Sequence, residues 1–215
     1  MNSLCAVLML VTSLAGDAKK PTRWDFEDAT VGKLPADWTA TQTGEGEGSV
    51  WKILEDATAP KGKKVLAQTA AKGPSALFNL CVADKSRFAD LDLSVAFKAI
   101  AGKKDQGGGP VWRYQDAKNY YVVRMNPLED NFRLYKVVDG KRIQLATTKD
   151  DVVAAEGKWH TIRVVHQGNR IKCYLNGKLH FDVKDDAFKE AGKIGLWTKA
   201  DAQTSFDDIV IRKPE

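Results

Sequence analysis

Three short alternating segments in the stretch from Gly107 to Arg142 constrain the fold more than any other feature of the chain. Asx-type turn residues separate the first segment from the second, and a proline, which cannot donate to a β-ladder, follows the second. Asp139-Gly140 then favours a two-residue hairpin turn. The stretch therefore predicts three consecutive antiparallel strands, at residues 111–115, 119–126 and 132–138.

Short apolar-polar alternation, broken by Gly, Pro and Asn, continues through the rest of the chain. Residues 39–48 read as a polar, glycine-rich loop, and residues 185–191 are the only good candidate for a helical turn. Many short strands at regular spacing predict an all-β fold, a two-sheet antiparallel β-sandwich of the jelly-roll type. The further predicted strands are residues 22–28, 49–55, 64–69, 76–83, 92–101, 142–148, 157–165, 170–176, 179–183, 194–198 and 204–212.

The N-terminus resembles a secretory leader. Leu4 to Leu14 is an apolar run too short to span a bilayer, and Ser13 and Ala15 are small residues of the kind that a signal peptidase recognises. We therefore predict a signal peptide at residues 1–15, a short linker at 16–21 and one β-domain at 22–215. The protein is then expected to be secreted or periplasmic, with no stable membrane insertion after cleavage.

Charge and cysteine content narrow the possible partners. The 33 basic and 28 acidic residues are interspersed and give a net charge of +5, which favours anionic polysaccharide or an envelope surface, and no nucleic-acid motif is present. Cys5 lies in the leader, so Cys81 and Cys173 remain. They form either one disulfide or two unpaired thiols in the core, and the sequence leaves both alternatives open.

The middle strand of the central stretch has two different faces, because successive side chains on a strand point to opposite sides. Tyr121, Val123 and Met125 form an apolar side that suits the core. The opposite side mixes an aromatic ring, a guanidinium group and an amide, which is typical of a sheet face that binds a polar ligand. The alternative is an ordinary solvated sheet face with cross-strand pairing.

Three pieces of the chain together resemble a known superfamily: WDFED…LPADW, GKWHTIRVVHQGNRIKCYLNGK and GKIGLWTKADAQTSFDDIVI. They are similar to the concanavalin A-like lectin/glucanase superfamily, in its laminin-G-like and 3-keto-disaccharide-hydrolase-like branches. The resemblance spans most of residues 22–212. It implies a two-sheet sandwich in an exported protein that binds or hydrolyses glycans, although fold kinship alone does not fix the chemistry.

Departures from the family favour binding over catalysis. The paired acids Glu-x-Asp-x-x-Glu of the family 16 glycoside hydrolases are absent, and Val122 stands where many keto-disaccharide-hydrolase relatives carry an acid. Arg113 stands at the family's arginine position, so the resemblance implies that ligand binding is retained. We therefore expect a carbohydrate-recognition domain, with a 3-keto-disaccharide-type glycoside hydrolase and a laminin-G-like protein-interaction module as alternatives.

The predicted sugar-binding face combines arginines and an amide with flat aromatic rings, on which the CH faces of pyranoses pack well. Each aromatic has packing in the core or at a sheet edge as its alternative role. The ligand-binding candidates are Trp112, Arg113, Tyr120, Arg124, Asn126, Arg133, Tyr135 and Trp197.

A structural calcium ion is the one cofactor that the resemblance implies, because jelly-roll relatives share such an ion between their first and last strands. Asp207 on the last predicted strand and Glu27 (or Asp28) on the first are the candidate ligands. The alternative is an Asp207 satisfied by backbone amides or by an arginine. His160, His166 and His180 have no zinc-binding spacing.

Overall fold

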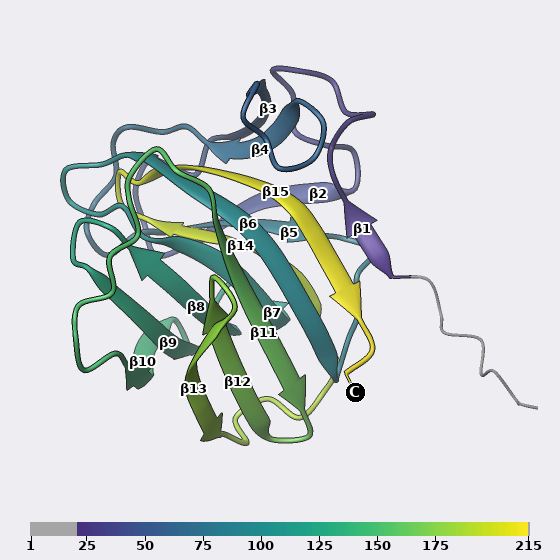
Figure 1. Ribbon diagram of the computed structural model, residues 1–215, viewed down its shortest axis with the longest axis vertical. Coiled ribbons are helices and arrows are strands. Elements are labelled where there is room, and N and C mark those ends of the chain that lie inside the picture. Colours follow the sequence, from purple (N-terminus) through teal and green to yellow (C-terminus); the bar gives the residue numbers. More distant parts are fainter. Residues whose placement is uncertain (1–20, 215) are drawn as a thin grey trace, which may run out of the picture.

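The computed structural model describes residues 21–214, which form fifteen β-strands in two antiparallel sheets packed face to face (Figure 1). Within this range no helix is long and apolar enough to cross a bilayer. The predicted signal peptide and most of the linker lie outside the described residues. The strands are β1 (Thr22–Trp24), β2 (Trp38–Thr43), β3 (Trp51–Glu55), β4 (Lys64–Gln68), β5 (Phe78–Ala83), β6 (Leu91–Ala101), β7 (Gly108–Asp116), β8 (Asn119–Asn126), β9 (Asn131–Val138), β10 (Lys141–Thr147), β11 (His160–Gln167), β12 (Arg170–Leu175), β13 (Lys178–Lys184), β14 (Lys193–Lys199) and β15 (Gln203–Arg212).

The order of the strands confirms the predicted all-β sandwich. One sheet has eight strands in the order β13-β12-β11-β6-β15-β4-β3, with β1 paired to β15. The other has seven strands in the order β10-β9-β8-β7-β14-β5-β2. The meander β7-β8-β9-β10 is the central stretch that the sequence predicted, and β11-β12-β13 is the second set of consecutive hairpins.

The core lies between the two sheets and follows the predicted alternation. Tyr121, Val123 and Met125 of β8 face inward, and Ile162 and Val164 of β11 meet them from the opposite sheet as part of one buried cluster. Cys81 and Cys173 belong to the same cluster, and both thiols are free. Of the two alternatives for the cysteines, the structure therefore contains the unpaired core thiols.

Three local expectations were wrong. Residues 38–43 form β2 instead of a loop, because the β-branched residues Thr39, Thr41 and Thr43 alternate along an edge strand that pairs with β5. Residues 185–191 contain bends but no helical turn. β1 ends at Trp24, because Phe26 takes a positive φ of 61°, which interrupts a regular strand.

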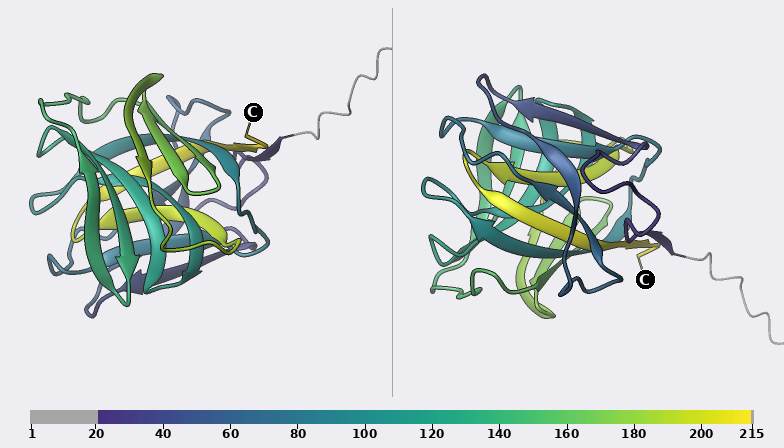
Figure 2. Two further views of the ribbon diagram at one scale, coloured as in Figure 1. Left: turned by 90° about the horizontal axis from the view of Figure 1, so that it is seen from below. Right: turned by 90° about the horizontal axis from the view of Figure 1, so that it is seen from above.

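The seven-stranded sheet is strongly curled, as the strands drawn in teal and green in Figure 2 show. Strands that are far apart in the sheet order come together on its outer face, the face turned away from the core. The hydroxyl groups of Thr43 on β2 and Tyr120 on β8 lie 2.8 Å apart. The guanidinium carbon of Arg142 on β10 lies 5.2 Å from the centre of the Phe78 ring on β5. The outer face is therefore concave.

Candidate functional site

The outer face of the seven-stranded sheet has a buried aromatic floor. Trp197 on β14 lies 5.4 Å from Phe78 between ring centres, and Tyr120 stacks on Tyr114 at 6.0 Å. Tyr120 and Trp197 have no exposed surface, and Tyr135 keeps 3%. Burial also raises the pKa of the Tyr120 hydroxyl above its ordinary value. These rings form a second, smaller core, so they support this face and do not present themselves to a ligand.

A polar cluster continues the floor toward the end of β8. Arg124, which is 1% exposed, donates to Glu129 Oε2 at 2.8 Å and to the carbonyl oxygen of Asn131 at 3.1 Å. Asn126 Nδ2 donates to Asp105 Oδ1 at 3.2 Å, and Asp105 is buried. The cluster is held together by its own hydrogen bonds, which fixes the positions of these side chains.

Glu129 is one of the two acids of this cluster, with Asp105, and its surroundings favour the ionised form. Partial burial opposes ionisation, but Arg124, Asn131 and Arg133 together hold the pKa of this carboxyl below its ordinary value. Arg133 Nη1 lies 3.4 Å from Glu129 Oε2. Glu129 is therefore a carboxylate at neutral pH and has no proton to donate.

Above the floor lies a layer of partly or fully exposed side chains that sequence reasoning mostly missed. These residues come from four different strands, and only Arg133 was among the ligand-binding candidates. The sequence could have indicated two of the others, Arg142 and Gln144. In the β9-β10 hairpin Arg142 pairs with Val137 and Gln144 pairs with Tyr135, so both lie on the same face as Tyr135. The exposed layer consists of Tyr114, Arg133, Arg142, Gln144, Lys193 and Lys199.

Arg142 lies over the aromatic floor. Its guanidinium carbon is 4.5 Å from the centre of the Tyr135 ring and 6.0 Å from that of Trp197, distances at which cation–π attraction operates. Its Nη1 atom is buried and makes no hydrogen bond. An N–H donor of Arg142 at the middle of this face thus lacks an acceptor.

Trp112 does not belong to this face, contrary to expectation. It lies fully buried between the sheets, where its ring stacks on Tyr121 at 5.6 Å. Its Nε1 donates to His166 Nδ1 at 2.9 Å, and burial lowers the pKa of His166 to about 4. The flat ring that suggested sugar stacking is therefore a part of the core.

Arg113 is also absent from this face. A β-bulge follows Trp112, and Arg113 takes a φ of 45°, which turns its side chain away from the neighbours expected for a regular strand. The guanidinium is 2% exposed and donates to the carbonyl oxygens of Ala89, Phe188 and Gly168 at 2.6–2.8 Å. Arg113 thus joins β7 to three loops.

The candidate calcium ligands Glu27 and Asp207 both receive backbone N–H groups from one loop. Lys63 N and Lys64 N donate to Glu27 Oε1 at 2.9 and 2.7 Å, and Lys61 N donates to Asp207 Oδ2 at 2.8 Å. Calcium takes six to eight oxygen ligands. Among the described residues no group of three or more His, Cys, Asp or Glu could hold a metal ion.

Asp207 is fully buried, and its Oδ1 makes no hydrogen bond. Burial, together with the charges of Asp208 and Glu27, raises the pKa of this carboxyl to about 6. The alternative to a calcium ligand, a carboxylate satisfied by backbone amides, therefore holds for Oδ2, which accepts from Lys61 N, whereas Oδ1 has no hydrogen-bond partner.

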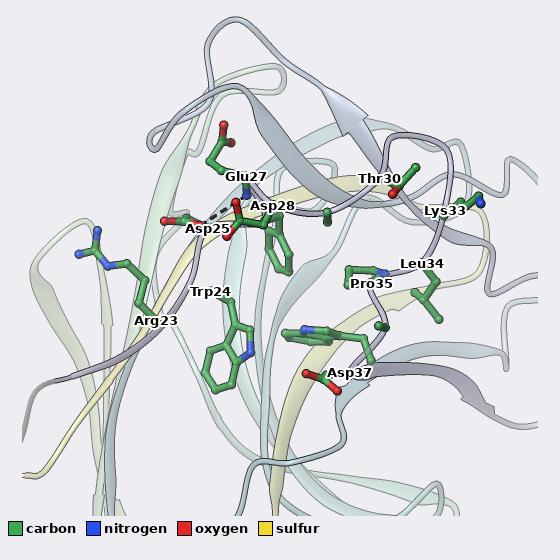
Figure 3. A pocket seen from close by; sticks show the side chains of 14 residues that line it. Arg23, Trp24, Asp25, Glu27, Asp28, Thr30, Lys33, Leu34, Pro35 and Asp37 are labelled. Carbon is green, nitrogen blue, oxygen red and sulfur yellow. Dashed lines mark hydrogen bonds between the residues drawn. The ribbon is translucent and has the colours of Figure 1, made fainter.

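A separate hollow of about 570 Å³ lies at the N-terminal loop between β1 and β2 (Figure 3). Trp24, Leu34 and Pro35 line one side, and Asp25 and Glu27 line the other. Asp25 accepts a long hydrogen bond of 3.4 Å from the backbone of Glu27. Apart from Glu27 and Asp28, this hollow shares no residue with the predicted sites.

Comparison with family models decides the kinship of the chain. A model described as the 3-keto-alpha-glucoside-1,2-lyase-like domain matches residues 26–212. The chain belongs to this family. The match agrees with the resemblance seen in the sequence, and it covers all of the outer face. No curated protein matches the chain.

Solved structures share the fold at low sequence identity. The carbohydrate-binding module CBM66 from Bacillus subtilis is 20% identical with a TM-score of 0.64, over 82% of this chain and 96% of that one. Domain 4 of AbnA, a GH43 arabinanase from Geobacillus stearothermophilus solved with arabinotriose, is 14% identical with a TM-score of 0.58, over 92% and 94%. The exoplasmic/lumenal domain of VIP36 in its Ca²⁺/Man-bound form is 11% identical with a TM-score of 0.56, over 84% of each chain.

Proposed function

We propose that this domain recognises carbohydrate on the concave outer face of the seven-stranded sheet. The observation that carries the proposal is the exposed layer of Tyr114, Arg133, Arg142, Gln144, Lys193 and Lys199 above a fixed aromatic floor. An exposed aromatic ring offers a stacking surface, and the amide and cations donate to hydroxyl groups. The sugar-binding relatives CBM66 and AbnA domain 4, which share the fold, support the same class of ligand.

The carboxylates of this face favour binding over hydrolysis. Paired-acid glycoside hydrolysis needs one carboxyl group that is protonated at working pH. Glu129 has a lowered pKa, and Asp105 is buried under Lys199 Nζ, which lies 3.1 Å from its Oδ2. Asp84 accepts from Thr39 at 2.8 Å and pairs with Lys193 at 3.2 Å. Each of the three is engaged in holding a neighbouring side chain.

Glycan-binding measurements on purified domain test the proposal. Tyr114→Ala and Lys199→Met should weaken binding of any glycan that the parent binds, because both remove side chains of the exposed layer. Arg212→Gln is the matched control, since Arg212 is exposed on β15 of the other sheet. Unchanged affinity in Tyr114→Ala and Lys199→Met would place the ligand elsewhere.

Cleavage of 3-keto-glucosides is the second candidate function, and the family match is the observation that favours it. Incubation with 3-keto-disaccharides, followed by mass spectrometry of the products, tests it against heat-denatured protein. Product formation that survives Tyr114→Ala would show that the chemistry does not need Tyr114.

We also propose export, on the basis of the leader at residues 1–15. N-terminal sequencing of protein from the periplasmic or extracellular fraction should give a start near Gly16. Calcium stays a prediction for this chain, supported by the Ca²⁺-bound state in which the VIP36 domain was solved. A fall in melting temperature on addition of a chelator would support it.

A further inference from the structure

Arg142 differs from the other cations of the exposed layer in having no carboxylate partner. Arg133 pairs with Glu129, Lys193 with Asp84 and Lys199 with Asp105, at 3.1–3.4 Å. The buried Arg124 below them pairs with Glu129 as well. Among these five cations, all in the part of the chain that the structure describes, Arg142 alone has neither an ion pair nor a hydrogen bond.

The place of Arg142 makes an unpaired charge costly. Its guanidinium lies between 4.5 and 6.0 Å from the centres of the Tyr135, Phe78 and Trp197 rings, and its Nη1 is shielded from water. A desolvated cation without an anion loses solvation energy, and cation–π attraction offsets only a part of that loss.

We infer that the saccharide bound on this face is acidic and that Arg142 binds its anionic substituent, a carboxylate. The inference rests on the proposed function and names the chemical class of its ligand. A guanidinium held over aromatic rings has fewer orientations open to its fork of donors, and a carboxylate accepts two parallel N–H bonds from such a fork.

The surrounding charges support an anion in this position. Arg133, Lys193 and Lys199 all lie on the same face, and the chain carries a net charge of +5. Their carboxylate partners reduce the local potential but do not reverse it, because each cation is matched by at most one acid. An incoming carboxylate therefore meets one unpaired cation and no unpaired acid among the residues described above.

Titration calorimetry with a panel of oligouronates tests the inference. Oligogalacturonate, oligoglucuronate and oligoalginate are each compared with their methyl esters, which keep the sugar backbone and remove the charge. Sulfated galactan oligosaccharides provide an anion of different geometry. The parent protein should bind at least one free acid about tenfold more tightly than its ester, a difference that should shrink at high salt.

Substitution of Arg142 locates the effect. Arg142→Gln should lose that preference, so that acid and ester bind alike, and Arg142→Lys should keep a part of it, because a lysine retains the charge but not the fork. Arg212→Gln removes the same charge from the other sheet and should bind as the parent does. Circular dichroism and melting temperature confirm that each variant is folded; if Arg142→Gln is not, Arg142→Lys carries the test.

Each other outcome is informative. If neutral glycans bind and no acid binds better than its ester, the inference is overturned while the proposed function stands. If no glycan of any kind binds, the proposed function fails first. If the protein prefers the sulfated oligosaccharide and that preference depends on Arg142, the inferred carboxylate ligand is wrong and Arg142 binds a sulfate instead. A preference for free acids that Arg142→Gln retains shows that Arg142 only covers the aromatic floor.

Discussion

Asp207 shows how one buried carboxyl group can limit stability. Its pKa of about 6 lies above the ordinary value of 3.8, because burial disfavours the charged form. The group therefore stabilises the fold fully below pH 4, and that contribution is lost as the pH rises through 6. We predict that Asp207→Asn raises the melting temperature by a few degrees above pH 6, and that the gain disappears below pH 4.

A chelator distinguishes this account from a calcium site. If Glu27 and Asp207 hold Ca²⁺, then Asp207→Asn lowers the melting temperature at neutral pH, and EGTA lowers that of the parent. Without an ion at Asp207, EGTA leaves the melting temperatures of both proteins unchanged, and Asp207→Asn raises the melting temperature at neutral pH. The effect of Asp207→Asn has opposite signs in the two cases, and EGTA has an effect in only one of them, so the two measurements together decide between the accounts.

We predict that His166 makes the stability of the fold sensitive to acid in a pH range different from that of Asp207. Burial lowers its pKa to about 4, and its Nδ1 already accepts from Trp112. An unfolded histidine titrates near 6.5, so the contribution of His166 is present above pH 6.5 and is lost as the pH falls to 4, by up to roughly 3 kcal/mol. The unfolding free energy, measured by chemical denaturation, should fall as the pH is lowered across that range, and it should fall less steeply in His166→Gln than in the parent. Equal slopes would assign the acid sensitivity to other groups.

At the residue scale, alternation in the sequence predicted on which face of a strand a side chain lies, but it did not predict whether that side chain is exposed. Alternation along β8 placed Tyr121 inward and Tyr120 outward, as the structure has them. Tyr120 and Trp197 are nonetheless buried because the sheet is curled. Local sequence patterns do not predict that curvature. Arg113 was misplaced for another reason, because a bulge after Trp112 interrupts the alternation.

At the scale of elements, the edge strand β2 closes the curl of the seven-stranded sheet. Thr43 Oγ1 donates to the carbonyl oxygen of Ala117, and its hydroxyl lies 2.8 Å from that of Tyr120 on β8. We predict that Thr43→Val costs about 1–2 kcal/mol of unfolding free energy, since these buried polar groups lose a partner. Urea denaturation measures the loss.

A double-mutant cycle isolates the contact between the two strands. Thr43→Val and Tyr120→Phe together should cost less than the sum of the single changes, because they remove one shared interaction. Strict additivity would show that the hydroxyl contact does not close the sheet. The sequence signal for β2 was weak for a physical reason: its outward residues are threonines, and polar alternation resembles a loop.

At the scale of the whole molecule, the class of fold followed from turn chemistry, but the order of the strands did not. Asp139-Gly140 and Asn176-Gly177 turn with positive φ at both residues, so the hairpins β9-β10 and β12-β13 were predictable from local sequence. The pairing of β6 with β15 joins segments more than one hundred residues apart. Such contacts depend on the packing of both sheets, and a single sequence does not encode them in any local pattern.

Arg113 is the residue that most directly joins distant parts of the molecule. It lies on β7, and its three carbonyl acceptors belong to the loops before β6, before β14 and after β11, with Asp90 Oδ1 at 3.4 Å as a fourth partner. A lysine has one ammonium group and cannot reach all four acceptors. We predict that Arg113→Lys lowers the unfolding free energy by about 3 kcal/mol, which for a domain of this size lowers the melting temperature by roughly 6–12 °C.

The matched control for this prediction is an arginine whose ion pair is exposed. Arg170 pairs with Asp182 at 2.6 Å on the surface of the other sheet, so Arg170→Lys should cost less than about 1 kcal/mol. Because Arg113 lies away from the exposed layer, folded Arg113→Lys should bind glycan as tightly as the parent. Weaker binding with unchanged stability would instead return Arg113 to the ligand-binding role that the family resemblance implied.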